Sequence, residues 1–139
     1  MVKLINLLSM SKNSTLEWVL RIAVAGEFLG HGVFGLQVKE GWIEYFTALG
    51  FSAESATTWL PWIGGLDVAL AAFALFFPIR VLVLWMALWG LWTAILRPLA
   101  GEPIWDFVER FANWGAPLAL LLVLGWPKKL NDWFKVRSK

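Results

Sequence analysis

Long apolar stretches alternate with short polar ones along the whole chain. A helix needs about 20 apolar residues to cross the hydrocarbon layer of a bilayer, at about 1.5 Å of rise per residue. Four stretches approach or reach that length, and they predict membrane-spanning helices over residues 16–36, 57–77, 79–96 and 112–126. The pattern therefore predicts an all-α integral membrane protein, a four-transmembrane-helix bundle formed by one membrane domain over residues 1–139.

Shorter segments between and beside these helices have an amphipathic pattern. Residues 37–58 and 103–111 each repeat apolar positions at helical spacing, which predicts short helices lying in the membrane interface. The first of these patterns consists of Trp42, Ile43, Phe46 and Leu49. We expect the basic tail, residues 127–139, to form an interfacial helix as well. Residues 1–15 lack the cleavage site of a signal peptide and are also predicted to be interfacial.

The composition strengthens the membrane interpretation. Hydrophobic residues make up 59% of the chain and charged residues 16%, with a net charge of +2, whereas soluble domains contain about 25% charged residues. The absence of cysteine excludes disulfides, thiol catalysis, iron–sulfur clusters and thiolate metal sites. The basic residues do not gather into a patch for nucleic acid.

The basic residues are distributed unequally between the two predicted sides of the bundle. One side holds Lys39, Arg97 and Arg110, and the other side holds the remaining nine of the twelve. Cytoplasmic loops are enriched in lysine and arginine. We therefore predict that both termini and the turn around Arg80 are cytoplasmic. The nine residues of that side are Lys3, Lys12, Arg21, Arg80, Lys128, Lys129, Lys135, Arg137 and Lys139.

A few ionisable residues interrupt the apolar helices. Glu27 and His31 are four residues apart and share one helix face. Glu27 lies about 14 Å from the outer end of its helix, and Asp67 lies at a similar depth in the second helix. Arg97 at the outer end of the third helix and Asn113 in the fourth complete the set. The sequence predicts one pocket in the outer half of the bundle, lined by Glu27, His31, Asp67, Arg97 and Asn113.

Two interpretations of this pocket follow from the cost of burying charge in lipid. Ionisable residues inside membranes usually mark a functional site, such as a ligand or proton site. In the second interpretation the carboxyl groups are protonated and bonded across helices, and they serve packing only. A single histidine argues against a bis-histidine haem within one chain, and no spacing diagnostic of a metal site occurs.

Small residues accompany the ionisable ones on the first two predicted helices. Gly26 and Gly30 form a small-xxx-small pair, which allows two membrane helices to approach closely. Gly64 and Ala71 lie on the face of the second helix that carries Asp67. We therefore expect all four small residues to face other helices.

Several short motifs follow one another along the chain: Arg21, Gly30-His31-Gly32, Phe46, Leu49-Gly50-Phe51, Gly64-Gly65-Leu66-Asp67 and Arg80. Their order resembles the DoxX-like family of small membrane proteins. The resemblance covers about residues 21–126 and implies a four-helix transmembrane bundle. Some members of that family are small subunits of quinone-reducing enzymes such as thiosulfate:quinone oxidoreductase. Asp67 stands where the family usually has glutamate.

The residues and the resemblance together lead to a functional expectation. We expect a multi-pass protein of a bacterial or archaeal inner membrane, a redox-associated subunit that binds a quinone or a similar hydrophobic molecule. No covalently bound cofactor is expected, because the chain has no cofactor motif, and the redox chemistry would come from a partner. That partner would be a redox subunit, and a homo-oligomer is the other assembly considered. The alternative is a structural or assembly subunit without ligand chemistry. A proton or solute carrier is a third interpretation, but the chain has no pair of broken helices of the transporter kind.

Overall fold

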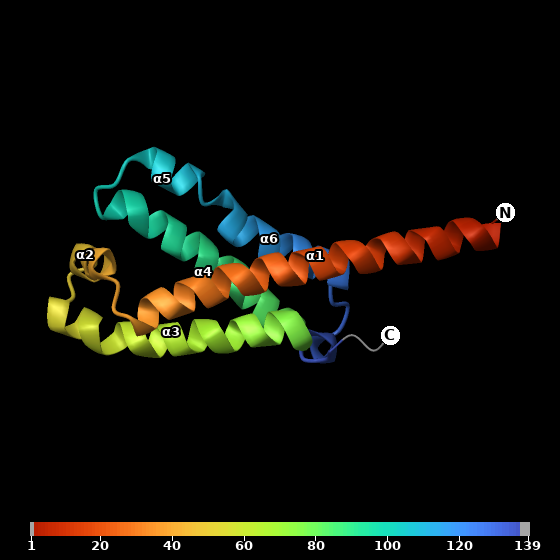
Figure 1. Cartoon of the computed structure of the whole chain (residues 1–139), viewed down its shortest axis with the longest axis horizontal. Helices are drawn as coiled ribbons and strands as arrows, with labels where there is room; N and C mark the ends of the chain where they lie inside the picture. Colours follow the sequence, from red (N-terminus) through yellow and green to blue (C-terminus); the bar gives the residue numbers. More distant parts are fainter. Residues whose placement is uncertain (1, 137–139) are drawn as a thin grey trace.

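The computed structural model describes residues 2–136, with side chains described from residue 13 onward. This part of the chain is helical and contains no strand. Figure 1 shows the helices in chain order. The elements are α1 (Val2–Leu36), η1 (Glu40–Trp42), α2 (Ile43–Ala48), α3 (Ala53–Phe76), α4 (Arg80–Leu99), α5 (Ile104–Val108), α6 (Phe111–Leu124) and η2 (Leu130–Trp133), where η marks a 3₁₀-helix.

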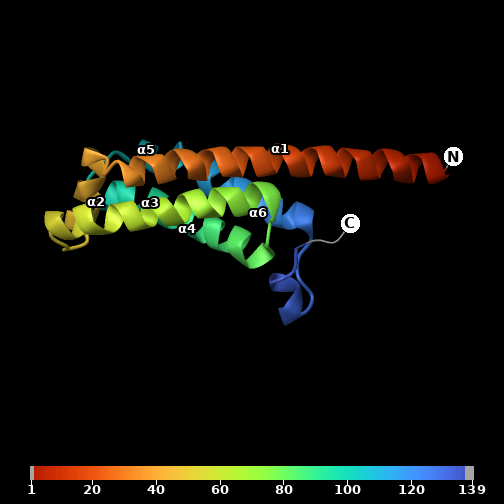
Figure 2. The same cartoon turned by 60° about the horizontal axis from the view of Figure 1, so that its bottom comes forward.

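Four helical segments are long and apolar enough to cross a membrane, which confirms the predicted all-α bundle of four transmembrane helices. Figures 1 and 2 show the long helices lying along one another, with α2 and α5 at one end and η2 at the other. The chain is thus a small integral membrane protein. The four segments are Asn13–Leu36, Ala53–Phe76, Arg80–Leu99 and Ile104–Leu124.

The first helix is longer than the sequence pattern predicted. α1 begins at Val2 and continues to Leu36 without a break. The predicted separation of residues 1–15 as an interfacial segment is therefore wrong for residues 2–15, and Met1 lies outside the described residues. No proline or glycine occurs between Val2 and Ala25, so nothing in the sequence ends the helix there. In both views the start of α1 projects beyond the other helices.

The other helix ends follow local backbone chemistry. α3 begins earlier than predicted because the Ser52 hydroxyl accepts a hydrogen bond from the amide of Ser55 at 3.1 Å, which caps the helix at this point. α6 ends where Gly125 adopts a φ of 87°. The predicted interfacial helix of the tail is wrong, since the only helix among residues 127–136 is the short η2. Arg137 and Lys139 lie outside the described residues.

Glycines bring α1 and α3 together. Gly64 on α3 faces α1 as predicted, but the glycines that it meets on α1 are Gly32 and Gly35, not the predicted Gly26 and Gly30. A Cβ atom on Gly64 would lie 2.6 Å from the carbonyl oxygen of Gly32, and one on Gly35 would lie 2.8 Å from the Cα of Gly64. By contrast, a Cβ on Gly26 or Gly30 would meet no atom within 4 Å. The prediction for Gly26 and Gly30 is therefore wrong, because the close contact uses a neighbouring face of α1.

The described side chains form a densely packed core in one half of the bundle. All four long helices contribute to it, and Ala71 belongs to it as predicted. Close packing of these side chains holds the helices together at that end and closes the bundle on one side of the cavity. The buried members are Val24, Ala25, Phe28, Leu70, Ala71, Ala74, Val83, Met86, Leu120, Leu121 and Leu124.

Arg80 ties the end of α6 and the tail to the start of α4. Its guanidinium donates hydrogen bonds to the carbonyl oxygens of Leu124 at 2.8 Å and Gly125 at 2.9 Å. It also donates to the carbonyl oxygen of Asp132 at 3.2 Å. Carbonyls at the end of a helix have no partner within the helix. Arg80 therefore satisfies two of them and fixes the tail against the bundle.

Candidate functional site

A cavity of about 240 Å³ lies in the other half of the bundle, away from the packed core. Its lining comes from α1, α3 and α4, from the segment between Trp42 and Phe51, and from the start of α6. The structure brings all five predicted site residues to this one cavity, although their role in binding stays a prediction. They are Glu27, His31, Asp67, Arg97 and Asn113.

Two carboxyl groups from different helices line the cavity. Asp67 on α3 is only 4% exposed, and Glu27 on α1 is half-buried. Among the described residues, no hydrogen bond reaches Oε1 of Glu27 or Oδ1 of Asp67, and neither atom is accessible to solvent. The indole of Trp89 donates a hydrogen bond to Asp67. A buried polar atom without a partner costs about 1–3 kcal/mol, so a molecule that supplies partners to these carboxyl groups is favoured here.

Aromatic side chains form most of the remaining wall. The ring of His31 lies 5.7 Å from the ring of Trp42, measured between centroids, with an angle of 56° between their planes. Trp89 stacks on Trp85 at 5.9 Å and 15°, and Trp89 also lines the cavity. An apolar cavity with a few convergent polar groups is the usual form of a small-molecule site. The aromatic members of the lining are Phe28, Trp42, Tyr45, Phe46, Phe51, Trp89 and Trp92.

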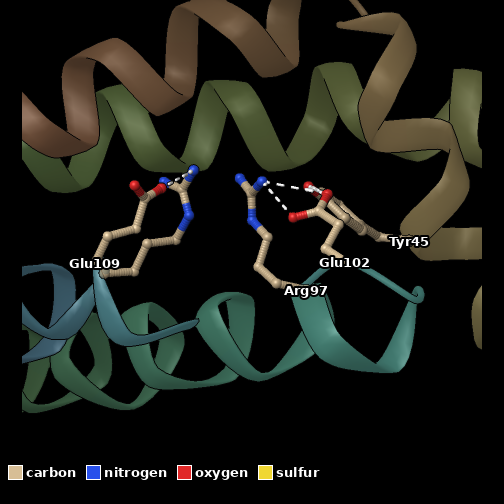
Figure 3. A network of polar contacts seen from close by, with 5 residues as sticks. Tyr45, Arg97, Glu102 and Glu109 are labelled. Atoms are coloured by element: carbon tan, nitrogen blue, oxygen red, sulfur yellow. Dashed lines mark hydrogen bonds and ion pairs between the residues drawn. The ribbon is translucent and has the colours of Figure 1, made fainter. Parts of the chain in front are cut away.

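A hydrogen-bonded network joins α2 to the turn between α4 and α5 at the edge of the cavity (Figure 3). Nη1 of Arg97 donates to the two carboxylate oxygens of Glu102 at 3.0 and 3.4 Å. The Tyr45 hydroxyl donates to Oε1 of the same carboxylate at 2.6 Å. The Arg97 guanidinium also lies 4.9 Å from the centre of the Tyr45 ring. We call these three residues the Tyr45–Glu102–Arg97 network.

The network shifts the pKa values of Tyr45 and Glu102 in opposite directions. Burial raises the pKa of Tyr45 above its ordinary value, and the hydrogen bond to Glu102 raises it further. Partial burial alone would raise the pKa of Glu102, but the hydrogen bonds from Tyr45 and Arg97 outweigh that effect and lower it below its usual value of 4.5. At neutral pH, Tyr45 is therefore a donor and Glu102 is a carboxylate.

Arg110 is a cavity residue that the sequence reasoning missed. It precedes α6 and pairs with Glu109, with 3.3 Å between Nη2 and Oε1. Asn113, which was predicted, follows three residues later. Residues three apart lie on the same helix face, so this spacing was the signal available in the sequence. Its position in a segment interpreted as an amphipathic surface helix concealed it.

The charges around the cavity are arranged in pairs. Among the described residues, Nε of Arg97 and Nε of Arg110 are buried without a hydrogen-bond partner. Each arginine is held by a glutamate that does not line the cavity, Glu102 or Glu109. The two arginines can therefore offer N–H donors to a molecule in the cavity, while their charges are balanced from outside.

The described residues do not contain a group of three or more His, Cys, Asp or Glu side chains that could hold a metal ion. The arrangement instead suits a molecule with hydrogen-bonding groups on a flat apolar body. Comparisons with models of protein families, with curated proteins and with solved structures gave no match.

Proposed function

We propose that this protein binds a quinone, or a similar hydrophobic redox molecule, in the cavity lined by Glu27, His31, Asp67, Arg97 and Asn113. The observation that carries the proposal is the convergence of these polar groups with aromatic side chains in a single cavity between membrane-spanning helices. A packing cluster alone needs no such space, because helix interfaces in membranes are normally closed by small residues.

The size of the cavity fits a ring system rather than a whole lipid. Its volume is about 240 Å³, below the range of about 300–1,000 Å³ typical of sites that enclose drug-sized ligands. A head group of one or two rings fills such a space. An isoprenoid tail would then extend between the helices into the lipid, where its burial is favourable. Trp42, Trp89 and Trp92 would contact the faces or edges of the ring.

The polar groups supply complementary contacts to a quinone. A quinone carbonyl accepts hydrogen bonds, and Arg97 and Arg110 have donors without partners among the described residues. The reduced form carries hydroxyl groups, which can donate to the carboxylate forms of Glu27 and Asp67. His31 between these groups is suited to exchanging a proton with the ligand. Electrons would come from a partner subunit.

We further propose the membrane in which the protein resides and its orientation there. The resemblance to the DoxX-like family favours a redox-associated subunit in a bacterial or archaeal inner membrane. The excess of basic residues near the termini and around Arg80 supports a cytoplasmic location for both ends. The cavity would then open in the outer half of the bundle. Cysteine labelling of Ser52→Cys and Ser138→Cys with an impermeant reagent would assign the two sides.

Titration with a quinone analogue tests the proposed function. Purified protein in detergent, wild type and His31→Ala, would be titrated with a short-chain ubiquinone or menaquinone analogue while thermal unfolding is followed in parallel. We expect the affinity to fall at least about fivefold in the variant, with little change in melting temperature, because the described part of the chain contains no hydrogen bond of the His31 side chain that would be lost. Gln37→Ala, at an exposed position just after α1, is the matched control.

The alternative of a structural or assembly subunit predicts a different result. In that case the polar cluster only fixes helix packing, and His31→Ala lowers the melting temperature without changing the affinity for the analogue. Absence of analogue binding to the wild-type protein would reject the proposed function outright.

A further inference from the structure

The charge of Arg97 is balanced from outside the cavity. Arg97 lines the cavity, but its carboxylate partner Glu102 does not. Only Nη1 of Arg97 is used in this contact, whereas Nε is buried without a partner among the described residues. Tyr45 holds the other side of the Glu102 carboxylate at 2.6 Å. Glu102 is thus fixed in a position where it cancels the charge of Arg97 and leaves a donor of Arg97 available.

Arg110 repeats the same arrangement. Its Nη2 contacts Glu109, whose side chain is 61% exposed and does not line the cavity. The Nε of Arg110 is also buried without a partner in the described part of the chain. The contact with Glu109 is more exposed to water than the one between Arg97 and Glu102, so we expect the balance of charge to depend more on Glu102.

The two acidic side chains that line the cavity also disfavour an anionic ligand. Glu27 and Asp67 are either neutral or negative, and neither attracts an anion. An anionic ligand would lose its hydration shell on entering and would meet two arginines that are already paired. A carbonyl oxygen loses little hydration by comparison and still accepts a hydrogen bond from Arg97. The cavity therefore combines donors for an acceptor atom with a charge balance that disfavours anions.

We propose that Glu102 is a specificity-determining residue, which makes the cavity select an uncharged carbonyl ligand over an anionic ligand of the same shape. This inference rests on the proposed function, because it concerns the ligand of the same cavity. It adds a residue outside the cavity lining and a chemical criterion, neutrality, that the proposed function does not contain. Removing the charge of Glu102 should leave Arg97 uncompensated and convert the cavity into one that accepts anions.

A pair of matched probes tests the proposal. 2-Acetylnaphthalene and 2-naphthoate have the same two-ring body and nearly the same shape, but the first ends in a neutral methyl ketone and the second in a carboxylate. Binding of each to protein in nanodiscs would be measured by equilibrium dialysis, with empty nanodiscs subtracted to remove partition into lipid. In the wild-type protein we expect the ketone to bind at least about tenfold more tightly than the carboxylate.

The variant Glu102→Gln should abolish or reverse this preference. The amide keeps the shape of the side chain and can still accept from Tyr45, but it carries no charge. We expect the affinity for 2-naphthoate to rise about tenfold or more, while the affinity for the ketone changes little. Glu54→Gln, an exposed carboxylate in the first turn of α3, is the charge-matched control.

The outcomes separate this inference from the function on which it rests. Binding of neither probe, together with no binding of a quinone analogue, would reject the proposed function. Binding of the ketone with an unchanged preference in Glu102→Gln would overturn the inference and leave the proposed function standing. Equal binding of the two probes to the wild-type protein would also overturn it, and this measurement needs no variant that has to fold.

Discussion

The same four helices build two halves of the bundle that differ in packing. In one half, Met86, Leu120 and Leu121 are fully buried and the side chains fill the space between the helices. In the other half, the helices enclose a cavity of about 240 Å³ that contains carboxyl, imidazole and guanidinium groups. Figure 1 shows α4 diverging from α3 toward the end that carries α2 and α5.

The difference follows from the residues that each half places between the helices. The packed half uses alanine, valine and leucine, whose side chains interdigitate closely. The hollow half contains Trp89 and Trp92 together with charged side chains, which need hydrogen-bond partners and cannot collapse onto one another. One end of the bundle thus supplies stability, and the other end tolerates an unfilled space. Substitutions should therefore affect the two ends differently.

The largest effect is expected in the packed half. Met86 on α4 is 0% exposed, and Met86→Ala removes most of a buried side chain and leaves a void. We expect the free energy of unfolding to fall by about 2–5 kcal/mol, measured by thermal or denaturant unfolding in detergent. Leu88→Ala on the same helix, at a position that is 55% exposed, is the control and should change little. Equal losses in the two variants would contradict the assignment of the packed core.

The fold was predictable because it depends on long patterns. Apolar stretches of membrane length locate the spanning helices whatever the details of packing, and the structure confirms four of them. The start of α1 was not predictable in the same way. The sequence pattern placed a boundary between residues 15 and 16, but nothing in that stretch ends a helix. Composition marks where a membrane segment begins, whereas a helix ends only at a specific backbone signal such as Gly125.

The residues that line the candidate site could be predicted from the sequence more fully than the residues that pair with them. Depth along the helices placed Glu27, His31 and Asp67 together, since rise per residue is fixed. Glu102 could not be found in this way, because it lies in a turn whose path depends on tertiary structure. The sequence pattern assigned no ion-pair partner to Arg97, and in the structure Glu102 pairs with it. Sequence reasoning finds residues on regular elements more readily than their partners in loops.

A second substitution tests the hollow half, where α1 and α3 are in close contact at Gly64. A Cβ on Gly64 would lie 2.5 Å from the backbone nitrogen of Leu36, and a backbone atom cannot give way cheaply. Gly64→Leu should therefore lower the free energy of unfolding by about 1–3 kcal/mol or more. Gly30→Leu should have little effect, because a Cβ there meets nothing within 4 Å. A larger loss from Gly30→Leu would indicate that Gly30 contacts another helix in the assembled protein.

The smallest expected effect is a dependence of stability on pH that originates at the hollow end. The pKa of Glu102 in the folded protein lies below its usual value of 4.5, chiefly because the donors Tyr45 and Arg97 outweigh the effect of partial burial. The stabilisation is therefore complete above pH 4.5 and is lost as the pH falls through the lower, folded-state pKa.

The contribution of ionised Glu102 to the free energy of unfolding is limited because its side chain is 27% exposed. We expect about 1 kcal/mol or less after allowance for solvent screening.

Unfolding would be measured from pH 7 down to the lowest pH at which the folded protein remains soluble, for wild type, Glu102→Gln and the control Glu54→Gln. Other carboxyl groups also titrate in this range, so the informative quantity is the difference between wild type and each variant. For Glu102→Gln this difference should shrink as the pH falls below 4.5, because protonation removes from the wild type the charge that the variant already lacks. Glu54→Gln controls for the loss of an exposed carboxylate elsewhere on the molecule. A difference for Glu102→Gln that does not change with pH would show that the network contributes through shape alone, and the charge assigned to Glu102 at the edge of the cavity would lose its support.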